Sequence, residues 1–414
     1  MSGRKIFFTI AIAFSLLCVL VVGFAFLFYR RYIAPFQAMK ELPPEIKEAR
    51  VLLGAELLSR TEFLKFQFGS VEDIVVGELD GKPGQDIGIA GRLGAKLVDR
   101  EGQLKEQTSY QFERETRKLG PLEIKPEKMS LGDIRIVDLE GDGVCEYFGR
   151  GSTDGAAVFD HQGKALWSYG SFTEEKTSID DLAVGDLDGD GVAEFLASWD
   201  GYELFDRSGV KRWTQAQKYT GQVEIVDADG DGKADIICDD GPIMTVRDAE
   251  GQVREKVGMP FTLGNFSLVK WDDKQPPRIL DTDKGQLWLI GLDGQVVSKF
   301  DAPLSELKKP HPEKIEIPGM SEPYVSDTDT LYQTEGVRVR LSKDKDPYFA
   351  VVARFAVLDH SLFYVYDASG KLVYQEVMPE ACSAIAVLKP EGEDGAQVLL
   401  VGGSETVWRY AARQ

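Results

Sequence analysis

The chain is poor in the residues that enzymes most often use for catalysis. Its 414 residues include only three histidines and four cysteines. No GxSxG, HExxH or phosphate-binding glycine motif occurs in it. The histidines His161, His311 and His360 stand far apart, and His161 falls in an expected hairpin turn. These absences favour a protein that is not an enzyme.

Disulfides and positive charge are also scarce. Cys18 lies in an apolar stretch, whereas Cys145, Cys238 and Cys382 lie in separate repeat units, so no disulfide framework is predicted. Lysine and arginine number 48 against 68 aspartates and glutamates, which gives a formal net charge of −20. Nucleic acids and anionic membrane surfaces attract basic patches. Neither is therefore expected as a partner.

One long apolar run stands at the start of the chain. Residues 6–28 carry no charge, and basic pairs flank them at 4–5 and 30–31. About 20 apolar residues suffice to cross a bilayer, and the run exceeds the usual core of a cleaved signal peptide. The sequence thus predicts a single-pass transmembrane anchor over residues 1–33, with the rest of the chain tethered to the membrane.

A stalk helix is predicted between this anchor and the remaining chain, over residues 34–60. Two prolines at 43–44 suit a helix start. Ile46, Ala49, Leu53 and Leu57 then follow at helical spacing.

Three nearly identical acidic loops are the strongest signal in the chain. They read DLEGDGVCE at 138–146, DLDGDGVAE at 186–194 and DADGDGKAD at 227–235. Carboxylates occupy positions one, three, five and nine, and glycines occupy positions four and six. Such clusters of oxygen ligands are typical of calcium sites. Strand-like apolar runs flank the loops, and position twelve holds Gly149, Ala197 or Cys238, so an EF-hand is excluded.

A second signature marks β-hairpins along the chain. An Asp or Gly followed three residues later by Gly recurs at 98–104, 159–167, 205–213, 247–253, 290–296 and 366–372. Together the two signatures define a unit of four strands that repeats about every 40 to 50 residues, which predicts an all-β, seven-bladed β-propeller over 61–414. The blades begin near Val71, Leu131, Ile179, Val223, Phe266, Val337 and Ala384.

The last unit has only three strands before the chain ends at Gln414. A closed propeller leaves few open edges. We therefore expect the run TEFLKFQFG at 61–69 to supply the missing strand, so that both ends of the propeller region close the ring.

The acidic loops resemble those of the FG-GAP or VCBS group of propeller repeats, which is found in integrin α-subunit heads and bacterial surface proteins. The repeat character covers residues 71–414, and the resemblance implies two or three Ca²⁺ sites. Side-chain ligands would come from positions one, three, five and nine, with a backbone carbonyl from position seven. By this resemblance the ligands are Asp138, Glu140, Asp142, Val144 and Glu146, then Asp186, Asp188, Asp190, Val192 and Glu194, then Asp227, Asp229, Asp231, Lys233 and Asp235.

The first of these loops departs from the pattern through Glu140, whose extra methylene crowds the cation. The loop ELDGKPGQD at 78–86 departs further, because Lys82 stands at position five and offers an ammonium group in place of a metal ion. Residues 270–278 and 389–397 lack acids at positions one and nine, so these loops are expected to be structural.

Calcium sites of this kind need plentiful calcium, which places the propeller outside the cytoplasm. The sequence predicts an extracytoplasmic, calcium-binding interaction or adhesion module for a protein or glycan, with insertions at 107–130 and 301–335 as candidate binding loops. The alternative is a propeller enzyme: a hydrolase, a lyase or a quinone-dependent enzyme. Its strongest hint is the Asp-x-x-Gly-x-x-x-Trp spacing at 160–167 and 206–213, which resembles quinoprotein repeats, although blade packing explains both tryptophans.

Overall fold

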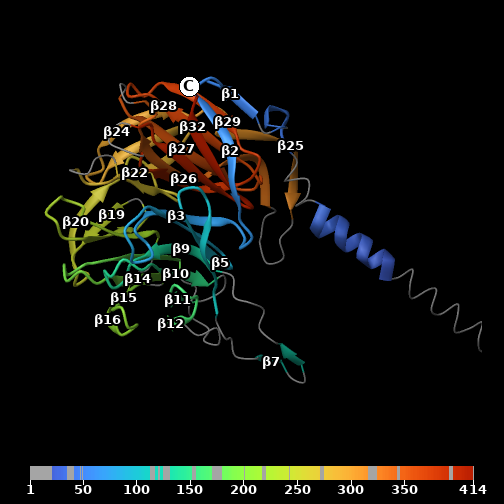
Figure 1. Cartoon of the computed structure of the whole chain (residues 1–414). Coiled ribbons are helices and arrows are strands. Elements are labelled where there is room, and N and C mark those ends of the chain that lie inside the picture. The colour runs from blue at the N-terminus through green and yellow to red at the C-terminus, as the bar shows by residue number, and fades with distance from the viewer. Residues whose placement is uncertain are drawn as a thin grey trace, which may run out of the picture. The chain divides into compact units, whose positions relative to one another are not determined.

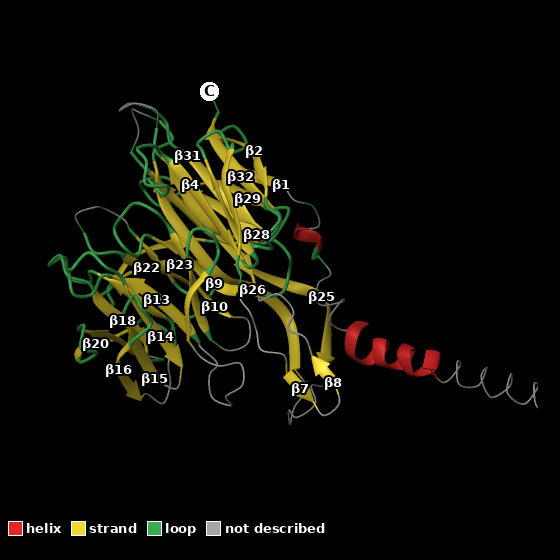
Figure 2. Ribbon diagram, turned by 60° about the horizontal axis from the view of Figure 1, so that its bottom comes forward, coloured by secondary structure: helices red, strands yellow, loops and turns green. Residues whose placement is uncertain are grey.

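In the computed structural model the described residues form mostly β-strands (Figures 1 and 2). The chain divides into two units. The larger unit comprises residues 48–305, 331–355 and 360–414, and the smaller comprises 306–330, 356–359 and the described residues before 47. The description runs from residue 21 to residue 413 and leaves out 35–41, 47, 49, 112–116, 120–121, 125–130, 152–154, 170–179, 200, 217–220, 242, 271–274, 316–323, 343–345 and 391–394.

The larger unit is the predicted seven-bladed β-propeller of four-stranded antiparallel blades. Blades 1 to 4 take their strands in chain order. Blade 1 contains β3 (Val71–Gly77), β4 (Asp86–Gly91), β5 (Gly94–Val98) and β6 (Leu104–Ser109), and blade 2 contains β9 (Leu131–Val137), β10 (Glu146–Gly151), β11 (Ala156–Phe159) and β12 (Ala165–Tyr169). Blade 3 contains β13 (Asp181–Gly185), β14 (Glu194–Trp199), β15 (Gly201–Phe205) and β16 (Lys211–Ala216). Blade 4 contains β17 (Val223–Val226), β18 (Asp235–Asp239), β19 (Ile243–Arg247) and β20 (Val253–Gly258).

Blades 5 to 7 complete the ring and confirm the predicted count. Blade 5 contains β21 (Ser267–Val269), β22 (Arg278–Asp283), β23 (Gln286–Gly291) and β24 (Val296–Asp301). Blade 6 contains β26 (Tyr324–Val339), β27 (Tyr348–Phe355), β28 (Ser361–Tyr366) and β29 (Leu372–Val377), and blade 7 contains β30 (Cys382–Leu388), β31 (Val398–Gly403), β32 (Thr406–Ala412) and β2 (Leu58–Lys65).

The ring closes through a strand from the N-terminal side of the propeller, as the incomplete last unit predicts. Strand β2 pairs antiparallel with β32, with Leu58 opposite Ala412 and Lys65 opposite Thr406. The strand lies three residues earlier than the run predicted at 61–69. Its pairing satisfies the backbone groups that β32 would otherwise leave unpaired at the edge of the blade.

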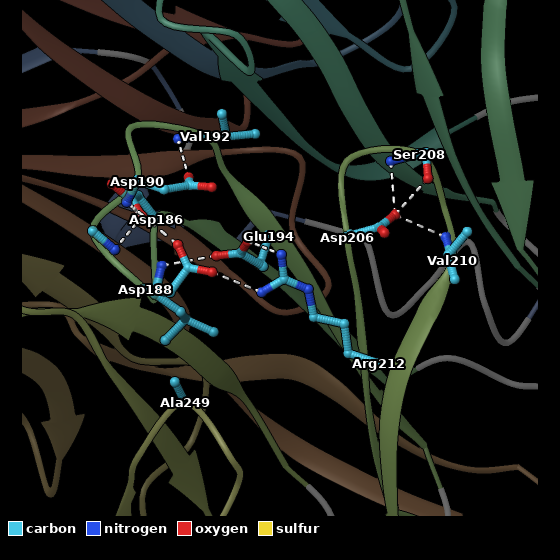
Figure 3. A network of polar contacts seen from close by, with 12 residues as sticks. Asp186, Asp188, Asp190, Val192, Glu194, Asp206, Ser208, Val210, Arg212 and Ala249 are labelled. Carbon is cyan, nitrogen blue, oxygen red and sulfur yellow. Dashed lines mark hydrogen bonds and ion pairs between the residues drawn. The ribbon is translucent and has the colours of Figure 1, made fainter.

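The outer hairpins form where the second signature stands. In blade 3, one oxygen of Asp206 accepts the amides of Ser208 and Val210 at 2.9 and 3.0 Å (Figure 3). Gly209 has a φ of 79°, which glycine adopts without the strain that a side chain would add. The second and third strands of the blades are mostly buried on both faces, whereas the fourth strand β16 alternates between exposed and half-buried residues.

Aromatic side chains pack between neighbouring blades. The ring of Trp167 from blade 2 lies 5.1 Å from Phe195 and 5.9 Å from Phe205 of blade 3, measured between centroids. This contact supports the assignment of that tryptophan to blade packing. The cysteines Cys145, Cys238 and Cys382 are buried and unpaired, in agreement with the absence of a disulfide framework among the described residues.

The predicted stalk helix at 34–60 is wrong. Its described residues form a 3₁₀ turn, η2 (Pro44–Ile46), the strand β1 (Arg50–Leu53) and the beginning of β2. Strand β1 pairs with the outer strand β29 of blade 6, and Gly54, at a φ of 68°, turns the chain toward β2. Hydrogen bonding to an open sheet edge outweighs the helical spacing of the leucines here.

The predicted transmembrane helix at 6–28 is also not borne out. No helix among the described residues is long and apolar enough to cross a membrane. The described part of the N-terminal helix, residues 21–34, includes the π-helical turn η1 (Tyr29–Ile33). Residues 6–20 of the predicted span lie outside the described residues.

Both predicted insertions contain additional strands. The first carries a short hairpin of β7 (Arg117–Leu119) and β8 (Leu122–Ile124). The second contains β25 (Glu306–Ile315), which pairs with the beginning of β26 in the smaller unit. Within that unit, the carboxylate of Asp329 accepts the amides of Val357 and Leu358, which fixes the segment 356–359 to this strand pair.

Candidate metal centre

Each acidic loop joins the first and second strands of its blade. The loop at 138–146 connects β9 to β10, the loop at 186–194 connects β13 to β14, and the loop at 227–235 connects β17 to β18. The glycines at positions four and six have φ angles of 78° and 85° in the middle loop, at Gly189 and Gly191. Their left-handed backbone folds the loop back, so that its amides meet its own carboxylates.

The acids at positions one and five accept hydrogen bonds from backbone amides of their own loop. In the middle loop, the two oxygens of Asp186 accept the amides of Gly189 and Gly191 at 2.7 and 2.9 Å, and Asp190 accepts the amide of Val192 at 2.8 Å (Figure 3). All three bonds recur in the loop at 227–235. In the loop at 138–146 the last two recur, and the amide of Asp142 donates to the first oxygen of Asp138. The carboxylates are therefore held in place by the fold of the loop itself.

The acid at position nine of each loop, which we call the ninth acid, anchors the loop to the blade. It is the first residue of the second strand, it is buried, and it accepts the amide of the residue at position two. The pairs are Glu146 with Leu139 at 3.0 Å, Glu194 with Leu187 at 2.9 Å and Asp235 with Ala228 at 3.3 Å. The loop of blade 1 contains the same bond, from the amide of Leu79 to Asp86 at 3.3 Å.

Two of the three loops bring candidate metal ligands together. Asp186, Asp188 and Glu194 each place one carboxylate oxygen within 4.8 Å of the others, and Asp227, Asp229 and Asp231 do the same. Asp190 and Asp235 lie outside these groups. In the described loop at 138–146, the acids Asp138, Glu140, Asp142 and Glu146 form no such group. The carbonyl ligands predicted at Val144, Val192 and Lys233 stay predictions.

A basic side chain that the motif search missed lies at each of the two convergent groups. The guanidinium of Arg212, from β16, lies 3.0 Å from Asp188 and 2.9 Å from Glu194 (Figure 3). Arg254, from β20, lies 2.8 Å from Asp229 and 2.6 Å from Asp235. A positive group thus already stands where hard oxygen donors converge, and the donor set fits a cation such as Ca²⁺.

The degenerate loop of blade 1 also meets an ammonium group, but chiefly a different one from that predicted. Lys82 reaches Asp80 at 3.7 Å, and its side chain is 78% exposed. Lys105, from β6, lies closer to Asp80, at 3.2 Å, and forms an ion pair with the buried Asp86. The main counter-ion therefore comes from the fourth strand of the blade and not from the loop.

The electrostatic environment of the ninth acid differs between blades. Burial raises the pKa of Glu194 and that of Asp235, while Arg212 and Arg254 respectively oppose this rise. Burial also raises the pKa of Glu146, to about 7, and the neighbouring carboxylates of its loop add to the effect. No ion pair reaches Glu146 among the described residues.

A second group of acids lies on the innermost strands of the propeller. Asp73 on β3 and Asp181 on β13 each accept an amide of the next blade, that of Ile136 at 2.9 Å and that of Val223 at 2.8 Å. These bonds join the inner strands of neighbouring blades. Glu224 on β17, Glu335 on β26 and Asp133 on β9 complete the inner group together with the guanidinium of Arg135.

The described acids of the inner group are attracted to Arg135 but make no direct ion pair with its guanidinium. Burial opposes the charge of Arg135, but Glu224, Asp181 and Asp73 raise its pKa. Burial raises the pKa of Asp181 to about 7 and that of Glu335 to about 8. No ion pair of Arg135 within 4.0 Å is found in the described structure, so its attraction to the acids acts at longer range.

Comparison with known proteins identifies the fold alone. No family model matches the chain, and no curated protein matches it either. A streptogramin B lyase structure has a TM-score of 0.50 at 9% identity, covering 87% of this chain and 99% of that chain. The structure of BBS1N in complex with ARL6DN has a TM-score of 0.50 at 10% identity, covering 86% and 96%. The WD40 domain of Neurospora crassa Pan2 has a TM-score of 0.48 at 9% identity, covering 84% and 95%.

Proposed function

We propose that this protein is a calcium-stabilised β-propeller that works outside the cytoplasm as a non-catalytic interaction module. The observation that carries the calcium part is the convergence of three carboxylate oxygens within 4.8 Å in the loops at 186–194 and 227–235. Ca²⁺ takes six to eight oxygen ligands in flexible geometry, so carboxylates, a backbone carbonyl and water complete such a site. The resemblance of the loops to FG-GAP or VCBS repeats supports the same ion.

Calcium would act on the scaffold of the blade. In the middle loop, Asp186 and Asp188 belong to the turn, whereas Glu194 begins the second strand and is 1% exposed. An ion shared by these carboxylates links the turn to the strand and offsets their mutual repulsion. The site therefore holds the edge of the blade in one conformation, and recognition falls to other surfaces of the ring.

The partner we propose is a protein or a glycan. The formal net charge of −20 disfavours polyanionic partners. The additional strands β7, β8 and β25, within the predicted insertions at 107–130 and 301–335, are not part of the four-stranded blades. The BBS1N structure, which is a complex with ARL6DN, is an example of a propeller neighbour that binds a protein.

Thermal unfolding of the full-length chain tests the calcium part. Ca²⁺ at 100 times its dissociation constant stabilises a site by about 2.7 kcal/mol, which corresponds to a rise in Tm of about 5 °C. We expect EDTA to lower the Tm and calcium to restore it, whereas Mg²⁺ at equal concentration restores less. The double variant D229N/D231N should lose one binding event in calorimetry and leave the others intact. An unchanged Tm in EDTA contradicts the proposal.

Binding measurements test the interaction part. The full-length chain would be applied to a glycan array and to purified candidate surface proteins, in calcium and in EDTA. We expect saturable binding that weakens in EDTA, because the loops lose their fixed conformation. Binding that is unaffected by EDTA separates recognition from the metal loops, and failure on every glycan and protein surface contradicts this function.

A second candidate function is an enzyme acting at the inner strands, and one observation favours it. Asp181 and Glu335 have pKa values raised to about 7 and about 8 beside the guanidinium of Arg135, as general acids often do. A hydrolase or lyase is the class that uses such groups. A panel of ester, lactone and glycoside substrates tests this candidate. Turnover that D181N abolishes supports it, and turnover that persists in D181N assigns the activity elsewhere.

A further inference from the structure

Six outer hairpins of the propeller share one register. In each, the third residue after the hairpin glycine is the second residue of the fourth strand. The residues at this place are Lys105 in β6, Leu166 in β12, Arg212 in β16, Arg254 in β20, Val297 in β24 and Val373 in β29. Because the hairpins match, a side chain at this place starts from the same position relative to the acidic loop of its own blade.

The basic residues at this place make the same two contacts. Each contacts the acids at positions three and nine of its loop. Arg212 lies 3.0 Å from Asp188 and 2.9 Å from Glu194, and Arg254 lies 2.8 Å from Asp229 and 2.6 Å from Asp235. Lys105 makes the corresponding pairs with Asp80 and Asp86. Three blades therefore use one geometry to bring a cation to their acids.

The contact matters most for the acid at position nine, because its side chain is buried. The side chains of Glu194, Asp235 and Asp86 are 1%, 3% and 1% exposed. A buried carboxylate without a counter-ion destabilises a fold, because the lost hydration is not replaced. A guanidinium or ammonium group from the fourth strand supplies the missing positive charge from within the blade.

Blade 2 is the exception among the loops that keep the acidic pattern. Leu166 occupies the place of the basic residue, and its side chain is largely exposed. The ninth acid, Glu146, is nevertheless 8% exposed, and the described residues provide it with the Leu139 amide and no ion pair. No three acids of this fully described loop bring carboxylate oxygens within 4.8 Å of one another, unlike those of blades 3 and 4. Arg207 of blade 3 reaches only the exposed Glu140, at 3.9 Å, and not Glu146.

Blade 5 shows the converse arrangement. Positions one and nine of its loop hold Lys270 and Arg278, so the acids at these two positions are missing although Asp272 stands at position three, and Val297 occupies the place of the basic residue. The presence of a basic residue on the fourth strand thus follows the presence of these acids in the loop, with blade 2 as the exception.

We propose that Lys105, Arg212 and Arg254 are internal counter-ions that compete with divalent cations for the acidic loops, and that the loop at 138–146 depends on an external cation because Leu166 leaves it without one. The part concerning the external ion rests on the proposed function of the loops as calcium sites. In the loops of blades 3 and 4, Ca²⁺ then binds in competition with Arg212 or Arg254, whereas the loop of blade 2 has no basic residue from its fourth strand to displace.

Calcium titration calorimetry and thermal unfolding of the full-length chain test this proposal in four proteins: the wild type, L166R, its uncharged control L166Q, and R212Q. In L166R the affinity of the calcium site in the loop of blade 2 should fall at least tenfold, and the Tm in EDTA should rise above that of L166Q. In R212Q a calcium site should tighten at least tenfold, while the Tm in EDTA falls. Leu166 is exposed, so its variants should fold even if R212Q does not.

The outcomes separate the two proposals. If L166R and L166Q behave alike in both measurements, the proposal of internal counter-ions is contradicted, whatever effect calcium has on the wild type. If calcium and EDTA leave the wild type unchanged while L166R is more stable than L166Q, the internal counter-ion stands and the calcium sites fall. If R212Q retains its stability in EDTA and gains no affinity, Arg212 carries no such role.

Discussion

The acidic loops and the innermost strands both collect carboxylates, but they neutralise them differently. In the loop of blade 3, the guanidinium of Arg212 contacts Asp188 and Glu194 at 3.0 and 2.9 Å. On the inner strands, the guanidinium of Arg135 attracts Asp73, Asp181 and Glu224 electrostatically, but it forms no ion pair within 4.0 Å among the described residues. The loops of blades 1, 3 and 4 thus rely on direct contact with a basic side chain, whereas the inner strands rely on attraction to Arg135 over longer distances.

The difference has a consequence for protons. A carboxylate that touches a cation stays ionised at low cost, whereas a half-buried carboxylate without contact lowers its cost by binding a proton. Asp181 and Glu335 therefore have pKa values raised to about 7 and about 8, mainly through burial. The inner strands, and Glu146 in the loop of blade 2, are expected to respond to pH. The loops of blades 1, 3 and 4 are expected to respond to metal ions and to changes in their basic residues.

The pH profile should give the largest effect. The folded state holds protons on Asp181 and Glu335 that the unfolded chain releases near pH 4, so the free energy of unfolding falls as pH rises through these raised values. From these two groups together we expect a loss of about 5 kcal/mol between pH 5.5 and pH 8.5, measured by urea unfolding in EDTA. The double variant D181N/E335Q should remove this part of the slope and leave the contribution of Glu146, whose pKa burial also raises to about 7.

A matched control for the pH experiment lies on an outer hairpin. Asp206 accepts hydrogen bonds from Ser208 and Val210, and these bonds lower its pKa despite the opposing effect of burial. D206N should therefore leave the slope between pH 5.5 and pH 8.5 unchanged. If D206N flattens the slope and D181N/E335Q does not, the assignment of the titrating groups is wrong.

Removal of Arg135 should give the next largest effect. R135M leaves Asp73, Asp181 and Glu224 without their common positive charge, which we expect to cost about 2 kcal/mol at pH 8.5, less than the loss of a contacting ion pair. The cost should shrink at pH 5.5, where Asp181 and Glu335 are protonated. R135K keeps the charge and should restore most of the stability. An equal loss in R135K and R135M points to packing instead of charge.

Much of the fold was accessible from sequence because its signals are local. The glycine and aspartate spacings of the loops and hairpins encode turns, and seven such units leave one strand missing, which β2 supplies. The stalk helix was not accessible in this way. Its leucine spacing is local, but the pairing of β1 with β29 joins residues more than 300 positions apart and overrides it.

The two acidic regions differ in the same respect. The ligands of the loops lie within nine consecutive residues, and even Arg212 could have been found three positions after the hairpin glycine. The inner group could not, because Asp73, Arg135, Asp181, Glu224 and Glu335 come from five blades and share no motif. Only the closure of the ring brings their charges together.

The smallest effect is expected at Glu194, and it separates hydrogen bonding from charge in the loop. E194Q keeps an oxygen that can accept the Leu187 amide and loses only the ion pair with Arg212. Because the Arg212 side chain is 38% exposed, water screens that pair, and we expect a loss of about 0.5 kcal/mol in EDTA. E194A also leaves the Leu187 amide without its acceptor and should cost about 2 kcal/mol. Chemical unfolding in EDTA measures both. A loss in E194Q as large as that in R135M means that the loop depends on charge as strongly as the inner strands do, which contradicts the contrast between them.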